Sequence, residues 1–249
     1  MALARNSCVA VSRLPLGTAN FTMAKSVSYR CWLAYLRTQG IGFSTTGSVC
    51  KRLKALVLHY GVGNVFSVSH AFRRLGFHVE MSQKIVRDVD CVILPGVGSF
   101  AAAAERIAPF REELVEFLVS GVPVLGICLG MQLMFEESDE GPGKGLNLYR
   151  GRVVSLPPTV KRPHMGWNRI KKTRASPLLE NIDDAWVYFN HTYHPQPADT
   201  SIIIATAHHG IEFPAVIGTK TIYGTQFHPE KSGPTGEKIL QNFAKLVKR

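Results

Sequence analysis

A cysteine between two glycines is the residue of this sequence best placed to do covalent chemistry. Cys128 stands at the centre of Gly126-Ile127-Cys128-Leu129-Gly130, directly after a short apolar run. This order is the thiol counterpart of a nucleophile elbow, a tight strand-to-helix turn that presents a reactive side chain at its tip. The helix that follows favours a thiolate through its N-terminal dipole. A buried structural cysteine is the alternative, but glycines on both sides of a strand–helix junction favour a nucleophile.

A second cluster, Gln226-Phe227-His228-Pro229-Glu230, follows about 100 residues later. A cysteine nucleophile needs a base to form the thiolate and an acid to protonate a leaving amine, and His228 suits both tasks near neutral pH. Glu230 could hold the second imidazole nitrogen. For His228 taken alone, a surface histidine with a local hydrogen bond is the alternative. We predict that the fold brings Cys128, His228 and Glu230 together as a triad.

A third cluster is the glycine-containing stretch Leu94-Pro95-Gly96-Val97-Gly98-Ser99. The glycines on either side of Val97 allow a backbone N–H to point into a cleft. Together with the N–H of Leu129, that group would complete an oxyanion hole. A phosphate-binding loop and an ordinary strand–helix turn are the alternatives.

The elements that must position these residues alternate along the chain. Apolar runs predict strands at 53–59, 77–81, 91–94 and 124–127, and helical patterns occupy 65–76, 100–119 and 129–137. Such alternation predicts an α/β fold with a doubly wound, mainly parallel sheet, which binds ligands at the carboxyl ends of its strands. Further short strands, mixed or antiparallel, are predicted at 152–156, 186–190, 202–207, 215–219 and 222–226, before a closing helix at 233–248.

Residues 1–52 differ in composition from the rest of the chain. They contain no Asp or Glu but seven Lys and Arg residues, and they are rich in Ser and Thr. This composition fits an organelle transit peptide, a region upstream of a misplaced start, or a plain basic tail. No apolar run in this segment is long enough to span a bilayer. We therefore predict a disordered basic extension over 1–52 and one catalytic domain over 53–249.

Charge and cysteine content narrow the range of functions. The chain carries a net charge of +11, of which +7 belongs to the extension, so the domain itself is only +4. This distribution gives little support for a nucleic-acid partner. The domain's two cysteines, Cys91 and Cys128, form neither a disulfide framework nor a metal-binding pattern, which predicts a reducing compartment. No metal, cofactor or membrane partner is expected.

Together the motifs resemble the class I glutamine amidotransferases. Within that class, the chain is similar to the glutaminase subunits of imidazole glycerol phosphate synthase, an enzyme of histidine biosynthesis. The resemblance covers essentially residues 55–249, and the stretch Pro163-His164-Met165-Gly166-Trp167-Asn168 points to this subfamily. It implies the flavodoxin-like α/β fold of the class, a mainly parallel sheet with flanking antiparallel strands.

The resemblance also implies residue roles. Cys128 would attack the carboxamide of L-glutamine and form a thioester, which releases ammonia, and His228 and Glu230 would complete the triad. The N–H groups of Leu129 and of Val97 or Gly98 would hold the oxyanion. The implied substrate-binding positions are Gln132, Glu140 and the backbone of Thr192 and Tyr193, and the implied partner-facing positions are Met165, Trp167 and Tyr188. For Trp167 and Tyr188, core packing is the alternative.

The resemblance further implies a partner. The domain is too short to include a β/α-barrel cyclase of about 250 residues, so the ammonia would pass to a separate cyclase subunit in a heterodimer. The alternatives are an amidotransferase subunit of another synthase and a catalytically silent regulatory subunit. A cytoplasmic location is expected, or a plastid or mitochondrial one if residues 1–52 are a transit peptide.

The chain departs from the usual family pattern at several positions. His59 replaces an acidic residue before Tyr-Gly-x-Gly-Asn, and Val65-Phe66 replaces Leu-Arg. Asn190 and His194 stand where apolar or aromatic residues are usual. None of these is a triad position, so we expect them to affect subunit contact and activation more than the chemistry.

Overall fold

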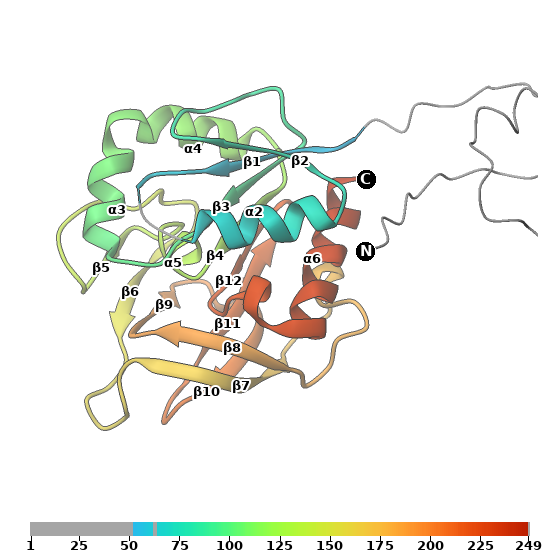
Figure 1. Cartoon of the computed structure of the whole chain (residues 1–249). Coiled ribbons are helices and arrows are strands. Elements are labelled where there is room, and N and C mark those ends of the chain that lie inside the picture. Colours follow the sequence, from blue (N-terminus) through green and yellow to red (C-terminus); the bar gives the residue numbers. More distant parts are fainter. Residues whose placement is uncertain (1–51, 62–63, 249) are drawn as a thin grey trace, which may run out of the picture. The chain divides into compact units, whose positions relative to one another are not determined.

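The computed structural model describes residues 52–61 and 64–248. Its centre is a nine-stranded sheet in the order β2-β1-β3-β4-β12-β11-β10-β7-β8, with helices on both faces (Figure 1). The predicted extension over 1–52 lies, except for Arg52, outside the described residues. The helices of the described part offer no segment that is long and apolar enough to cross a membrane.

One half of the sheet is parallel. Its strands, in spatial order, are β2 (His78–Ser82), β1 (Lys54–Leu58), β3 (Cys91–Leu94), β4 (Val124–Ile127) and β12 (Ile222–Thr225). Along β1, Ala55 and Val57 belong to the core on one face, and Leu56 and Leu58 to the core on the other. Strands that are covered on both faces need such uninterrupted apolar runs, which is why the sequence predicted them well.

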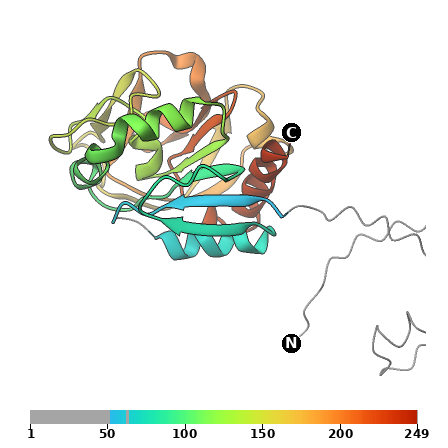
Figure 2. The ribbon, with the colours of Figure 1, turned by 90° about the horizontal axis from the view of Figure 1, so that it is seen from above.

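Helices cover both faces of the parallel half. One face carries α2 (Val65–Arg74) and α6 (Gly233–Val247), and the other carries α3 (Phe100–Ile107), α4 (Arg111–Val119) and the short α5 (Leu129–Gln132). Figure 2 shows α2 and α4 on opposite sides of the strands. The rings of Phe72 and Phe243, 6.2 Å apart and edge to face, join α2 to α6 in one core.

The other half of the sheet is antiparallel. It consists of β11 (Glu212–Thr219), β10 (Ile203–His208), β7 (His164–Lys172) and β8 (Trp186–His191). A second, three-stranded sheet contains β5 (Glu137–Ser138), β6 (Gly151–Ser155) and β9 (Tyr193–Pro197). Single turns of 3-10 helix occur at η1 (Ala108–Phe110), η2 (Pro177–Leu179), η3 (Thr200–Ile202) and η4 (Pro229–Lys231). The predicted α/β sheet with flanking antiparallel strands is confirmed.

Apart from the two-residue β5, two of these strands were not predicted from the sequence. In β7, the buried positions include His164, whereas Met165 and Trp167 are exposed. The usual rule of apolar residues inside and polar residues outside is therefore inverted, and a period-2 reading finds no strand. In β9, two prolines interrupt the sequence of the strand (Tyr193–Pro197), and proline is usually a sign of a turn.

Two predicted helices differ from the structure. The helix expected over 100–119 is divided into α3 and α4 by η1, which contains Pro109, because proline lacks an N–H and disrupts the preceding turn. The helix expected over 129–137 ends at Gln132. Beyond it, the carbonyls of Leu133, Met134 and Phe135 accept N–H groups from residues 146–149 instead of from the next helical turn.

The glycines of the elbow are required by close backbone approach. A Cβ on Gly130 would lie 1.8 Å from the carbonyl oxygen of Leu94 in β3, and a Cβ on Gly126 would lie 2.7 Å from the carbonyl oxygen of Gly130. A Cβ on Gly96 would lie 2.5 Å from the Cβ of Leu129. The elbow and the end of β3 therefore pack backbone to backbone, and any side chain would separate them.

We predict that Gly130→Ala lowers the free energy of unfolding by about 3 kcal/mol or more, because backbone atoms cannot move aside as a side chain can. Urea denaturation measures the change. Gly121→Ala is the control: its Cβ would meet no atom within 4 Å, and only the φ of +104° is unfavourable, which costs about 1–2 kcal/mol. Equal losses for the two variants would contradict this account of the elbow.

Candidate active site

Cys128 occupies a sharp turn between β4 and α5. Its φ of 53° and ψ of −106° lie in a region that residues with a side chain rarely adopt, and such strain is typical of functional turns. The N–H of Cys128 donates to the carbonyl of Thr225 at 2.7 Å, which ties the turn to β12. The geometry is that of a nucleophile elbow, with the side chain of Cys128 at its tip.

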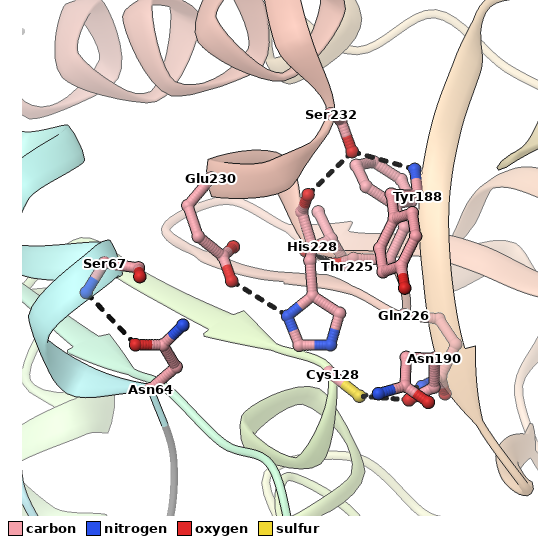
Figure 3. A network of polar contacts seen from close by, with 11 residues as sticks. Asn64, Ser67, Cys128, Tyr188, Asn190, Thr225, Gln226, His228, Glu230 and Ser232 are labelled. Carbon is pink, nitrogen blue, oxygen red and sulfur yellow. Dashed lines mark hydrogen bonds and ion pairs between the residues drawn. The ribbon is translucent and has the colours of Figure 1, made fainter. Parts of the chain in front are cut away.

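His228 and Glu230 lie beside this turn, between β12 and α6. Nδ1 of His228 is 2.9 Å from Oε1 of Glu230, and the two side chains are only 2% and 1% exposed. The backbone of His228 is held from both sides, since its N–H donates to the carbonyl of Tyr188 and its carbonyl accepts from the hydroxyl of Ser232. Figure 3 shows the imidazole between Glu230 and Cys128. The fold thus brings the three predicted triad residues together.

The imidazole of His228 is polarised by its two neighbours. Burial alone would lower its pKa, but Cys128 and then Glu230 outweigh this effect and raise the pKa to about 10. A histidine with such a pKa is protonated at neutral pH, so the site holds a proton donor beside Cys128.

A pocket of about 210 Å³ opens beside the sulfur. It is lined by the residues predicted for the oxyanion hole and for substrate binding: Val97, Gly98, Leu129, Gln132, Glu140, Thr192 and Tyr193. Pro163, Asn190 and His191 complete the lining. A larger hollow of about 290 Å³ lies on the other side of Glu230, between α2 and α6, and the nucleophile does not line it.

Polar groups at the pocket wall are already oriented. Oε2 of Glu140 accepts the N–H of Phe100 at 2.6 Å, which holds the carboxylate at the first residue of α3. Nε2 of Gln132 donates to the carbonyl of Tyr193 at 2.8 Å and to Oε1 of Gln226 at 3.3 Å. With both amide N–H groups engaged, the carbonyl oxygen of Gln132 is the atom that can accept from a ligand.

The predicted partner-facing residues share one face of the β7–β8 pair. Met165 is 60% exposed and Trp167 is 54% exposed, so the alternative of core packing is wrong for Trp167. Tyr188 is half-buried and lies directly opposite Trp167 in the register, with 6.2 Å between the ring centroids. The ammonium of Lys231 lies 6.0 Å from the Tyr188 ring, which adds a cation to this face.

The residues that depart from the family pattern lie in different parts of the structure. The carbonyl of Asn190 lies 3.8 Å from Sγ of Cys128, so this position borders the nucleophile. His194 is buried against the ring of Phe213. Phe66 is 65% exposed on α2, next to the buried Val65.

Sequence reasoning missed several polar residues that the fold gathers at the site. Gln226 is fully buried, and its Nε2 donates to Sγ of Cys128 at 3.6 Å. His191, at the pocket wall, and His164 behind it are both buried, with 3.0 Å between their ring nitrogens, and Asn168 adjoins them. In the sequence, the only indication of their role is that they lie inside or beside the motifs that carry the family resemblance.

The second cysteine of the domain is not placed for chemistry. Cys91 is fully buried in β3, and burial, followed by the charge of Asp90, raises the pKa of its thiol. Across residues 52–61 and 64–248, no group of three or more His, Cys, Asp or Glu side chains is arranged to hold a metal ion.

The fold and the site define a class. A cysteine elbow on a parallel sheet, with a His–Glu pair after a neighbouring strand, is the arrangement of the class I glutamine amidotransferases, and residues 56–247 match the family model of glutamine amidotransferase class-I. Solved structures share the fold: PurLQS from Thermotoga maritima matches with a TM-score of 0.63 at 18% identity, over 78% of this chain and 98% of that one.

Sequence relatives define the family within this class. The imidazole glycerol phosphate synthase subunit HisH of Sulfolobus acidocaldarius is 43% identical over 199 residues, which cover 79% of this chain and 100% of the relative. The subunit of the same name from Geobacillus sp. (strain WCH70) is 45% identical over 202 residues, which cover 77% of this chain and 96% of the relative. The chain belongs to this HisH family of glutamine amidotransferases.

Proposed function

We propose that this chain is the glutaminase subunit of an imidazole glycerol phosphate synthase in histidine biosynthesis. In this role it hydrolyses L-glutamine to glutamate and delivers the ammonia to a cyclase subunit. The observation that carries the proposal is the position of Cys128: its strained turn faces the pocket, and the buried His228–Glu230 pair lies beside it.

The reaction begins with attack of the Cys128 sulfur on the carboxamide carbon of glutamine. The N–H groups of Leu129 and of Val97 or Gly98 stabilise the negative charge that develops on the carbonyl oxygen. The His228 imidazolium gives its proton to the leaving amine, so the C–N bond breaks, ammonia departs and a thioester remains. His228 then takes a proton from water, which attacks the thioester and releases glutamate. Glu230 keeps the imidazole oriented through Nδ1 in both steps.

Substrate recognition is assigned to the pocket wall. The carboxylate of Glu140 pairs with the amino group of glutamine, and the backbone of Thr192 and Tyr193 holds its carboxylate. Oε1 of Gln132 accepts a further hydrogen bond from the substrate. The support is that all four positions line the one pocket that contains the sulfur.

The partner is a β/α-barrel cyclase that forms a heterodimer with this chain. The support is that the relatives named HisH are described as synthase subunits, a name that implies a partner subunit. The exposed face of Met165, Trp167 and Tyr188 is its docking site. An amidotransferase of another synthase is the second candidate, and the complete triad argues against a catalytically silent subunit.

The oxyanion loop offers a control point for this partner. Val97 lies between two glycines, and Gly98 has a φ of +127°, so the peptide can turn its N–H toward or away from the pocket. Losing one oxyanion donor costs about 3 kcal/mol, or about a hundredfold or more in rate. Contact with the cyclase would favour the competent peptide, which would limit glutamine hydrolysis to times when an acceptor of ammonia is bound.

The compartment is proposed to be the cytoplasm, or an organelle if residues 1–52 direct import. A fluorescent reporter fused to these residues distinguishes the two. An even cytoplasmic signal would rule out a transit peptide.

We predict that Cys128→Ala lowers glutamine turnover by at least about 10⁴-fold, because no other group can form the thioester. Ammonia release is measured with the cyclase subunit at saturation. Cys91→Ala is the matched control, since this thiol is buried in β3, and it should keep wild-type turnover. Residual hydrolysis by the Cys128 variant near the wild-type rate would exclude Cys128 as the nucleophile.

We also predict that Trp167→Ala weakens binding of the cyclase by roughly 10- to 100-fold, because exposed aromatic residues at the centre of an interface often contribute about 2 kcal/mol. Isothermal titration with the purified cyclase measures the affinity. Met81→Ala is the control: this side chain is 39% exposed on β2, at the opposite edge of the large sheet. The docking face would be wrongly assigned if both variants bound equally well.

A further inference from the structure

The Cys128 sulfur has a hydrogen-bond donor that the triad does not account for. Nε2 of Gln226 lies 3.6 Å from Sγ. In Figure 3, Gln226 lies on one side of the sulfur and His228 on the other. Gln226 is 0% exposed and lies at the end of β12, where its backbone N–H donates to the carbonyl of Ala215. The hydrogen-bond contacts of the sulfur are thus the Gln226 amide, which donates to it, and the Asn190 carbonyl, 3.8 Å away, while the His228 imidazole lies beside it.

The orientation of the Gln226 amide follows from its neighbour. A backbone carbonyl can only accept hydrogen bonds, so Gln132 must present its NH₂ group to the carbonyl of Tyr193. The other N–H of that group then points to Oε1 of Gln226. Gln226 must consequently turn its own NH₂ group to the sulfur.

The same carbonyl also sets the tautomer of a histidine. Nδ1 of His191 lies 3.0 Å from the Tyr193 oxygen and must carry the proton, which leaves Nε2 as an acceptor. That nitrogen accepts from Nδ1 of His164 at 3.0 Å, and Nε2 of His164 accepts from Nδ2 of Asn168 at 3.1 Å. Asn168 itself is fixed by a second donation, to the carbonyl of His208 at 2.9 Å. Each donor and acceptor role is thereby determined.

This pattern requires both histidines to be neutral. Burial and, secondarily, the proximity of His209 lower the pKa of His164 to about 4. Burial, followed by the charge of His164, lowers the pKa of His191 to about 3. At physiological pH each ring therefore has one N–H and one acceptor nitrogen, as the pattern demands.

We propose that a hydrogen-bond chain runs from the Tyr193 carbonyl through Gln132 and Gln226 to the sulfur of Cys128, and that Asn168, His164 and His191 form a second branch that donates to the same carbonyl. Within it, Gln226 is a positioning residue for the nucleophile. This inference rests on the proposed function, in which Cys128 is the nucleophile.

The chemical effect of the chain is to favour the thiolate. A hydrogen bond from an amide to a charged sulfur is stronger than one to a neutral thiol, so a donor held in place stabilises the ionised form. Without the chain, the Gln226 amide could rotate and turn its oxygen to the sulfur, which would oppose ionisation. The ionisable groups that face Cys128 are His228, backed by Glu230, and Tyr60, whose pKa is raised by burial and then by the Cys128 charge.

The polar groups of this chain are buried so deeply that each needs a hydrogen-bond partner. Gln132, His164 and His191 are 4–5% exposed, and polar groups without partners at such depth would cost about 1–3 kcal/mol each. A purely structural role, in which the groups only satisfy one another, is the competing explanation, so the test must report on the sulfur itself.

The test is the pH dependence of alkylation of Cys128 by iodoacetamide in the full chain, with the modified site identified by mass spectrometry. Iodoacetamide reacts with the thiolate and does not require the oxyanion hole. We expect Gln226→Leu to move the pH midpoint of alkylation up by about one unit, which lowers the rate about tenfold on the acid side of the midpoint.

The matched control is His194→Leu. His194 is also a buried histidine near the pocket, but its Nδ1 hydrogen-bonds to the carbonyl of the adjacent Pro195, outside the chain. This variant should keep the wild-type midpoint. A wild-type midpoint in Gln226→Leu, or an equal shift in His194→Leu, would overturn the proposal.

Gln226→Glu is a second variant for use if Gln226→Leu does not fold. It keeps the size of the side chain but replaces the donor by a carboxylate, so the midpoint should again rise, and an unchanged midpoint would again overturn the proposal. The wild-type protein separates this inference from the proposed function. If alkylation of Cys128 leaves glutamine turnover intact, the nucleophile is wrongly assigned and both proposals fail. If it abolishes turnover and Gln226→Leu keeps the wild-type midpoint, only the hydrogen-bond chain fails.

Discussion

The backbone contact between the elbow and the end of β3 is the constraint on which the site depends. Gly130 lies so close to the Leu94 carbonyl that even a methyl group would be excluded. This contact positions the start of α5 against the loop that follows β3, and it holds Cys128 in its strained conformation. The two elements that supply the proposed oxyanion donors are therefore joined by the same contact that presents the sulfur.

The charge of each buried histidine in this protein depends on the groups next to it as well as on its burial. His228, His191 and His164 are all buried, yet the pKa of His228 is raised to about 10, whereas the pKa values of the other two are lowered to about 3 and 4. The difference is the neighbour. His228 lies between a thiol and a carboxylate, whereas the other two face each other, His209 and neutral carbonyl or amide groups. The site can thus combine one charged imidazole with a chain of neutral ones.

The β7–β8 pair connects two surfaces of different character. Alternate residues of β7 point to opposite faces, so Trp167 is exposed while the neighbouring Asn168 turns inward to His164. A subunit that docked on the outer face would contact the strand that carries the start of the second hydrogen-bond branch. Because β7 is a single extended strand of nine residues, its two faces cannot move independently.

The sequence by itself determined the parts of this protein that depend on local order. Uninterrupted apolar runs predicted β1, β3 and β4, the spacing of Gly126, Cys128 and Gly130 predicted the elbow, and the proximity of His228 to Glu230 predicted their contact. Only the tertiary structure decided that α5 ends at Gln132, that β7 is a strand with its aromatic side outward, and that Gln226 donates to Cys128. These features arise from contacts between segments far apart in the chain, such as Cys128 and Gln226, 98 positions apart, and no local pattern records such contacts.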